Sequence, residues 1–173
     1  LAKINASLNA QYGKGKWCDA KGECKSIGDI EDVLADLKSS PEQKLAVWQG
    51  WHDSVGGPMR SEYARMVEIT NEGSKELGFD NTGALWRSKY DMPANDFAAE
   101  LDRLWGQVKP LYESLHCYVR TELNQKYGDQ VVPKEGAIPA HMLGNIWAQQ
   151  WGNLYPMMKP EGSKVEPWND ALI

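Results

Sequence analysis

Three side-chain amides recur at every fourth position near the end of the chain: Asn145, Gln149 and Asn153. On a helix, this spacing places them on one face. Amides can donate hydrogen bonds to a carboxylate or to a peptide backbone without adding a competing charge. The pattern therefore suggests either a peptide-binding face or an ordinary solvated one, and these residues alone leave both interpretations open.

A second, apolar stripe accompanies the amides and predicts a helix over residues 139–155. Its members are Leu143, Trp147, Trp151 and Leu154. The chain contains eight Trp and seven Tyr but only two Phe. Because Trp and Tyr join a large apolar body to a polar group, they suit the wall of a wet cavity, but they suit a core with satisfied hydrogen bonds equally well.

No catalytic motif is visible in the sequence. It contains no H-E-x-x-H, no G-x-S-x-G and no Gly-rich phosphate loop. His52, His116 and His141 are far apart in the chain, and packing or surface polarity explains them better than metal binding. We therefore predict no catalytic residue and no metal ligand in these 173 residues.

Two of the three cysteines are close together. Cys18 and Cys24 flank a short polar segment whose Gly22 permits a tight reversal, so we expect a local disulfide and an oxidising compartment. Half of a metal site is the alternative, but the spacing is wider than the usual C-x₂₋₄-C pair. We expect Cys117 to be a small buried thiol, and Asn5-Ala6-Ser7 is a formal glycosylation sequon.

Helical periodicity dominates the elements that would position these residues, so the predicted class is all-α. The strongest pattern covers residues 95–127, where apolar residues at spacings of three and four form one stripe that we expect to be buried. The stripe consists of Phe97, Leu101, Leu104, Val108, Leu111, Leu115, Tyr118 and Val119. Pro110 removes one backbone donor inside this helix and predicts a kink.

Capping and stop signals mark the other elements. Ser40 and Pro41 open a helix that Gly56-Gly57-Pro58 should end, and Gly78 should end the next one. The expected helices cover residues 30–37, 40–51 and 59–77. In the last of these, Tyr63, Met66, Val67 and Ile69 should face the core. Residues 126–139 predict a loop, with a short strand as an alternative.

Length and charge set further limits. A chain of 173 residues with 42% hydrophobic residues is sufficient for one domain. Its net charge of −5 and pI near 5.2 argue against nucleic acid as a partner. No apolar run reaches the roughly 20 residues of a membrane helix, so we expect a soluble chain with no transmembrane segment.

Several stretches resemble the angiotensin-converting enzyme family of zinc peptidyl-dipeptidases. They are residues 111–120, residues 138–155, Trp48-Gln49-Gly50-Trp51, Leu85-Trp86-Arg87-Ser88-Lys89-Tyr90 and the spacing of Cys18 and Cys24. They occur in the family's order and cover almost the whole chain. The resemblance implies a mostly helical ellipsoid with a deep central substrate channel.

The same resemblance implies where the chain lies in the enzyme. Residues 1–173 would be part of a single peptidyl-dipeptidase catalytic domain, truncated before the zinc-binding motif. Zinc would be held by two His and one Glu from the remaining part of the same protein, so the segment alone is expected to be inactive. The protein would be secreted, extracellular or periplasmic, and its substrate an oligopeptide with a free C-terminus.

The resemblance also assigns roles to individual residues. Gln149 matches the glutamine that helps to bind the C-terminal carboxylate of the peptide, with a lysine and a tyrosine from outside this segment. A carboxylate held at a fixed distance from the metal makes dipeptide release a geometric consequence. The carboxypeptidase branch carries arginine at this position, which favours the dipeptidase. Asn145 and Trp147 match residues that line the channel.

Other family positions are only partly matched. Tyr90 matches the tyrosine of one chloride site. His52 stands where a second chloride site has arginine, and a neutral imidazole replaces that permanent charge poorly. Gly28, with Asp29 beside it, stands where many relatives have an acid. A non-enzymatic helical peptide- or protein-binding module is the alternative function, and a carboxypeptidase-type relative is a further one.

Overall fold

A computed structural model describes residues 1–160 and 162, and it is predominantly helical, which confirms the all-α prediction. The α-helices and strands are α1 (Ala2–Lys14), β1 (Lys16–Cys18), β2 (Cys24–Ser26), α2 (Ile27–Ala35), α3 (Pro41–Trp51), α4 (Gly57–Glu76), α5 (Thr82–Arg87), α6 (Ala94–Tyr127) and α7 (Tyr155–Met158). Three short irregular helices are η1 (His52–Gly56), η2 (Ala140–Met142) and η3 (Gly152–Leu154).

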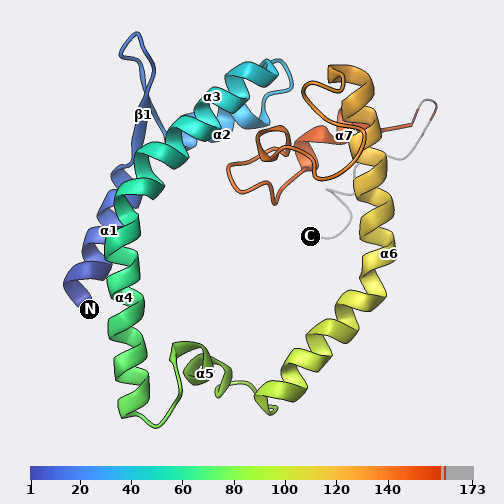
Figure 1. Cartoon of the computed structure of the whole chain (residues 1–173). Helices are drawn as coiled ribbons and strands as arrows, with labels where there is room; N and C mark the ends of the chain where they lie inside the picture. Colours follow the sequence, from blue (N-terminus) through green and yellow to red (C-terminus); the bar gives the residue numbers. More distant parts are fainter. Residues whose placement is uncertain (161, 163–173) are drawn as a thin grey trace, which may run out of the picture.

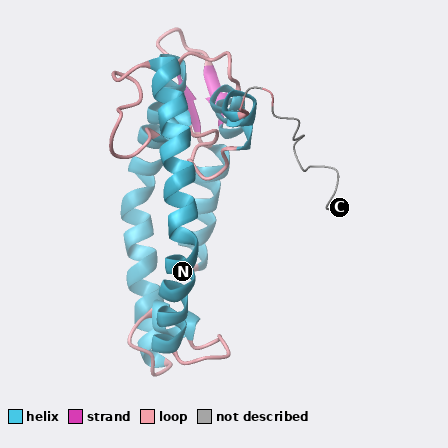
Figure 2. Ribbon diagram, turned by 90° about the vertical axis from the view of Figure 1, so that its right-hand side faces the viewer, coloured by secondary structure: helices cyan, strands magenta, loops and turns pink. Residues whose placement is uncertain are grey.

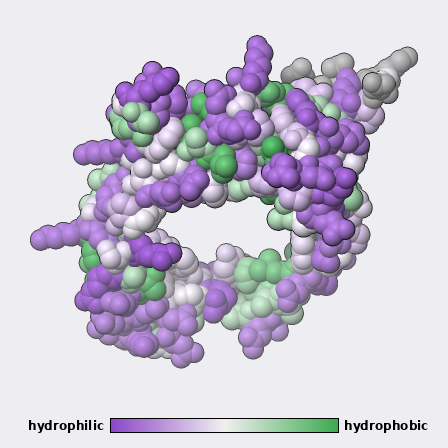
Figure 3. All heavy atoms as spheres, turned by 45° about the horizontal axis from the view of Figure 1, so that its top comes forward, coloured by the Kyte–Doolittle hydropathy of each residue, from purple (hydrophilic) through white to green (hydrophobic). Residues whose placement is uncertain are grey.

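The helices form an open ring. Figure 1 shows α4 on one side, α5 at the bottom and α6 on the other side, while α2, α3 and the orange C-terminal segment close the top. Seen from the side, the ring is narrow, with the small sheet at one end (Figure 2). The central opening persists when all heavy atoms are drawn as spheres (Figure 3). The helices of this chain thus surround a central opening.

The first side of the ring is one almost continuous helix, and the predicted stop at Gly56-Gly57-Pro58 is wrong. The α3 helix passes through the π-helix η1 directly into α4, and Gly56 and Gly57 keep helical backbone angles. Pro58 lies in the first turn of α4, directly after η1, and does not end the helix. The later stop at Gly78 is confirmed, since this residue has φ 85° just after α4.

Side-chain caps fix the starts of the helices at the top of the ring. Ser40 is the predicted N-cap of α3, and it also forms a capping box with Gln43, which was not predicted from the sequence. Ser26 and Asp29 form a second one, so α2 begins at Ile27 rather than at the predicted residue 30. Lys44 is buried on α3 and donates from Nζ to the Leu34 carbonyl, 2.7 Å away, near the end of α2.

The two short strands form an antiparallel hairpin that the helical interpretation of the sequence did not include. Cys18 and Cys24 lie directly opposite each other in its register and form the predicted disulfide. The third cysteine differs from its prediction, because Cys117 is free and exposed rather than buried.

The long helix α6 has the predicted extent but not the predicted burial. It contains Pro110, and Figure 1 shows that its two halves run in different directions. Only Val119 and Leu123 are buried along it. Most of the predicted stripe is exposed, with Leu111 reaching 75%, because no other element of the described chain covers the middle of this helix. The same correction applies on α4, where Tyr63 and Val67 are exposed.

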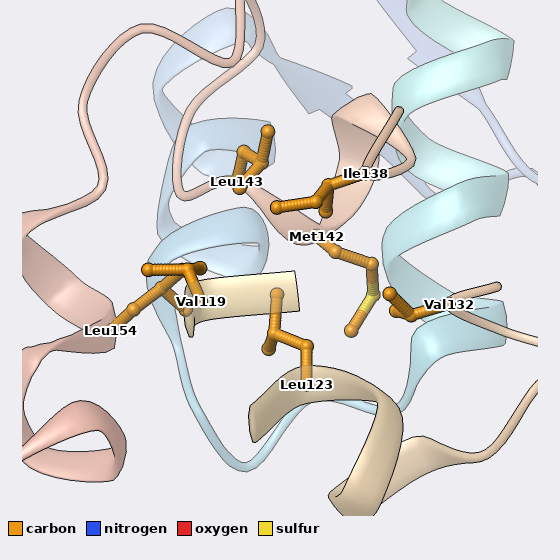
Figure 4. Packing of buried hydrophobic residues seen from close by; sticks show 7 residues of the cluster. All are labelled: Val119, Leu123, Val132, Ile138, Met142, Leu143 and Leu154. Carbon is orange, nitrogen blue, oxygen red and sulfur yellow. The ribbon is translucent and has the colours of Figure 1, made fainter. Parts of the chain in front are cut away.

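Two separate hydrophobic cores lie at the top of the ring. The α6 core consists of Val119, Leu123, Val132, Ile138, Met142, Leu143 and Leu154, which converge in Figure 4. The α3 core consists of Ile30, Leu34, Val47, Trp51, Val55 and Ile146. Residues 138–158, which we call the joining segment, contribute to both.

The joining segment is not the helix predicted over residues 139–155. It contains only η2, turns, η3 and the short α7. Residues 128–139, all of which the structure describes, form the predicted loop without a strand. In the described part of the chain, no helix is both long and apolar enough to cross a membrane.

Candidate carboxylate-binding segment

A tight turn at Gly144 breaks the helical pattern in the joining segment. The Asn145 N–H donates to the Leu143 carbonyl at 2.9 Å, and Gly144 between them has φ 81°. This γ-turn needs a positive φ at its centre, which glycine adopts without a steric penalty. A Cβ atom at Gly144 would also collide with the Gln150 carbonyl oxygen. Both the backbone angle and the lack of space therefore require glycine at this position.

Asn145 uses its side chain to fix the backbone at Gln149. Its Oδ1 accepts a hydrogen bond from the Gln149 N–H at 3.0 Å, and its backbone carbonyl accepts one from the Ala148 N–H at 3.1 Å. Asn145 is almost completely buried. Side chain–backbone bonds of this kind compete with helix formation, which explains why a spacing of four did not give a helix here.

Ala148 shows backbone strain next to Gln149. It has φ 55°, and it is the only described residue other than glycine with a positive φ. Such a conformation costs an alanine free energy, and it persists where surrounding contacts fix it. Two of those contacts are the bonds from Asn145, and a third comes from Trp151, whose Nε1 donates to the Ala148 carbonyl at 2.9 Å.

The segment is attached to α3 and α1 through aromatic residues. Trp48 donates from Nε1 to the Ile146 carbonyl at 2.9 Å. The ring of Trp147 stacks on Tyr12 with centroids 6.5 Å apart and planes 18° apart, and Trp147 remains half exposed. Burial, and after it the charge of Glu31, raises the pKa of Tyr12, so the phenol stays protonated at neutral pH.

The three amides do not share one face. Asn145 is turned inward to hold the backbone, Asn153 donates to the Ala35 carbonyl at 3.0 Å, and Gln149 is exposed. The sequence pattern thus singled out these three polar residues but placed them wrongly on one helical face. The Gly144-Asn145 pair is typical of a turn, and it was the sequence feature that argued against a helix over these residues.

Gln149 is the amide that is available to a ligand. Its side chain has no hydrogen-bond partner within the described residues, whereas its backbone is held by Asn145. Figure 1 shows the orange joining segment between α3 and α6 on the inner side of the ring. A pocket of about 490 Å³ on α6 is lined by Tyr112, His116, Cys117 and Arg120, and not by Gln149.

The other matched positions lie apart from this segment. Tyr90 lies on the connection from α5 to α6 at the bottom of the ring, where it stacks on Phe97 at 4.3 Å. His52 packs on Trp48, and its Nδ1 lies 2.7 Å from the Trp48 carbonyl oxygen. Asp29 caps α2 through Ser26, and these hydrogen bonds lower the pKa of its carboxyl group.

The described residues do not fit a zinc site. Residues 1–160 and 162 contain no group of three or more His, Cys, Asp or Glu side chains placed to hold a metal ion. His141 lies half buried, and burial together with the nearby Lys44 ammonium lowers its pKa.

Comparison with known proteins identifies the chain as a whole. The family model described as angiotensin-converting enzyme matches residues 1–170. The chain belongs to the angiotensin-converting enzyme family. The angiotensin-converting enzyme of Sus scrofa is 47% identical over 158 residues, which are 90% of this chain and 12% of that protein.

Two further relatives show how much of the family's length is present. The angiotensin-converting enzyme of Oryctolagus cuniculus is 40% identical over 158 residues, 90% of this chain and 12% of that protein. The angiotensin-converting enzyme of Theromyzon tessulatum is 37% identical over 166 residues, 92% of this chain and 26% of that protein. The chain thus spans between about an eighth and a quarter of these angiotensin-converting enzymes.

Proposed function

We propose that this chain is part of a zinc peptidyl-dipeptidase that removes C-terminal dipeptides from oligopeptides, and that Gln149 donates a hydrogen bond to the substrate's C-terminal carboxylate. Family membership supports the reaction class. The observation that carries the residue assignment is an exposed amide on a rigidly held backbone. An amide in this position binds an anion without adding a charge that would attract unrelated ligands.

Asn145 and Trp147 have supporting roles in this proposal. Asn145 is a positioning residue, because its carboxamide oxygen holds the Gln149 N–H. Trp147, stacked on Tyr12, gives the channel an apolar wall beside the amide. Holding the terminal carboxylate at one place lowers the entropic cost of aligning the scissile bond.

The catalytic centre lies in the remaining part of the same protein. The sequence contains no H-E-x-x-H, so the metal ligands and the general base would come from elsewhere in the polypeptide. Zinc there would polarise the water that attacks the scissile carbonyl. The segment alone would then hydrolyse nothing, and detecting dipeptide release from it in the presence of zinc would contradict this assignment.

The exposed stripe of α6 supports the presence of such a remainder. Leu104, Val108 and Leu111 lie on a helix whose middle has no covering element in the described chain. A continuous row of exposed apolar side chains is costly in water and is typical of an interface. We propose that the rest of the protein packs on this stripe and completes the channel.

Family membership also leads us to propose a chloride site and a cellular location for the protein. Tyr90 would contribute to one chloride site together with an arginine outside this segment, whereas His52 makes the second site an unfavourable one. The disulfide between Cys18 and Cys24 favours a secreted, extracellular or periplasmic protein.

The test is a pair of variants in the full-length protein. Gln149→Ala should weaken binding of peptides with a free C-terminus by about 1–3 kcal/mol, the scale of a hydrogen bond to a charged group. The neighbouring Gln150→Ala should leave it unchanged, because the proposal gives Gln150 no contact with the carboxylate. Isothermal titration with free-acid and C-terminally amidated peptides would measure both effects.

Three outcomes would decide between the candidate functions. Equal affinity of the two variants would remove Gln149 from the site. Binding without any hydrolysis by the full-length protein would favour the non-enzymatic binding module. Release of single amino acids, detected by mass spectrometry, would favour a carboxypeptidase.

A further inference from the structure

The N-glycosylation motif near the start of the sequence has no part in the proposed function. Asn5-Ala6-Ser7 is an N-x-S/T sequon, and no other Asn of the sequence has Ser or Thr two residues later. The triplet lies in α1, where Asn5 is exposed. Because sequons arise often by chance, the surroundings of Asn5 must decide whether a glycan can be accommodated.

The position of α1 leaves room for a large substituent. The helix is held against α4 through buried Leu8, and Asn5 lies three positions earlier, exposed to solvent. Figure 1 shows α1 on the side of α4 that faces away from the central opening. A glycan on Asn5 would therefore leave the opening free.

A shallow groove lies directly beside Asn5. It has a volume of about 310 Å³ and runs between α1 and α4, and Asn5 is one of its lining residues. Its other walls include Met59, Tyr63 and Met66 from α4. Tyr63 is 56% exposed, which is unusual for a large aromatic residue that the periodicity of α4 assigns to the buried face.

We infer that Asn5 carries an N-linked glycan and that its first sugars lie in the groove over Tyr63. Pyranose rings present a face of C–H groups that packs on an aromatic ring, while their hydroxyl groups stay in water. The glycan would thus cover apolar surface that α1 leaves open and replace it with a polar one. This inference rests on the secreted alternative of the proposed location, but it does not depend on the peptidase assignment.

The transfer itself needs a lipid-diphosphate-linked oligosaccharide and the transferase of that pathway. A bond forms between the Asn5 Nδ2 atom and the anomeric carbon, and the bond from that carbon to the diphosphate oxygen breaks. The amide loses one proton, and the lipid diphosphate leaves. Transfer takes place on the extended chain before α1 forms, so the helical state of the folded segment does not oppose it.

The first experiment tests occupancy. The full-length protein, expressed in eukaryotic cells and secreted, should lose mass with peptide-N-glycosidase, and Asn5 should then be recovered as Asp. Asn5→Gln and Ser7→Ala should abolish this, and Ser7→Thr should retain it. Asn9→Gln is the matched control, because Asn9 is exposed on the same helix without a sequon. Unmodified Asn5 in the secreted protein would overturn the inference.

The second experiment tests where the sugars lie. Nitration of Tyr63 should be several-fold slower in the glycosylated protein than in the Asn5→Gln variant. The Asn9→Gln variant is the control, because it keeps the sequon, and Tyr63 should be nitrated as slowly in it as in the unaltered glycosylated protein. Equal nitration of Tyr63 in both proteins, with Asn5 occupied, would overturn the placement over the groove.

Discussion

The C-terminal end and the middle of α6 lie in different surroundings. Its C-terminal end carries Val119 and Leu123, which pack with the joining segment in the α6 core. Its middle carries apolar residues of the same kind, but they are exposed to solvent. The apolar periodicity is the same along the whole helix. It therefore identifies the face of α6 that is suited to burial, but it does not tell whether another element of this chain covers that face.

The largest predicted change in the free energy of unfolding compares these two regions of α6 directly. Leu123→Ala removes a side chain with no exposed surface and should lower the free energy of unfolding by about 2–5 kcal/mol. Leu111→Ala makes the same change on the same helix where the side chain is 75% exposed, and it should cost within about 0.5 kcal/mol. Urea denaturation of this chain would measure both, and equal losses would mean that the middle of α6 is covered after all.

A second prediction concerns the polar contact between α2 and α3 at the packed end. Lys44→Met keeps most of the buried stem but leaves the Leu34 carbonyl without its ammonium donor, which should cost about 1–3 kcal/mol. Lys134→Met, at an exposed site, should change the stability little. Thermal unfolding of both variants would check this, and an undiminished stability of Lys44→Met would show that desolvation of the ammonium offsets the bond.

The turn that holds the candidate site offers a sharper test between two glycines. Gly136 and Gly144 have similar φ values of 84° and 81°, but only at Gly144 would a Cβ atom collide with backbone. Gly136→Ala should cost about 1–2 kcal/mol for the left-handed conformation alone. Gly144→Ala should exceed that cost and also weaken carboxylate binding in the full-length protein. Equal losses would indicate that residues 144–150 rearrange freely.

The smallest effect should be a dependence on pH at the packed end. His141 has a lowered pKa in the folded protein, so the unfolded chain binds its proton more readily as the pH falls below the ordinary value near 6.5. Stability should therefore decrease from pH 7.5 to pH 5, with the loss complete below the folded pKa. Denaturation at both pH values should show a smaller decrease for His141→Gln. A larger or unchanged decrease would assign the effect to other groups.

Local signals in the sequence predicted α2, α3, α4 and α6 but not α1 or α5, and the helix predicted in the joining segment is absent. The cap at Ser40, the stop at Gly78 and the extent of α6 each depend on neighbouring residues only, and the structure confirms them. The joining segment depends on distant contacts, such as Trp48 with Ile146 and Asn153 with Ala35. No periodicity contains such information, so the predicted helix there was wrong.

The candidate site was predicted in its residue types but not in its construction. Gln149 entered through the family resemblance, and its exposure agrees with a ligand role that remains a prediction. Tyr12 was missed, since nothing in the sequence relates a residue on α1 to Trp147. Cys117 was expected to be buried because it lies within a helical pattern, yet it is exposed.

The sharing of one segment by two cores has a consequence for local unfolding. Leu143 and Ile146 are three residues apart but belong to different cores, so neither core can open without disturbing the other. The amide hydrogens of α3 and of the C-terminal part of α6 should then exchange with solvent together, as one cooperative unit. Those of α5 should exchange earlier and independently, because none of its residues is buried.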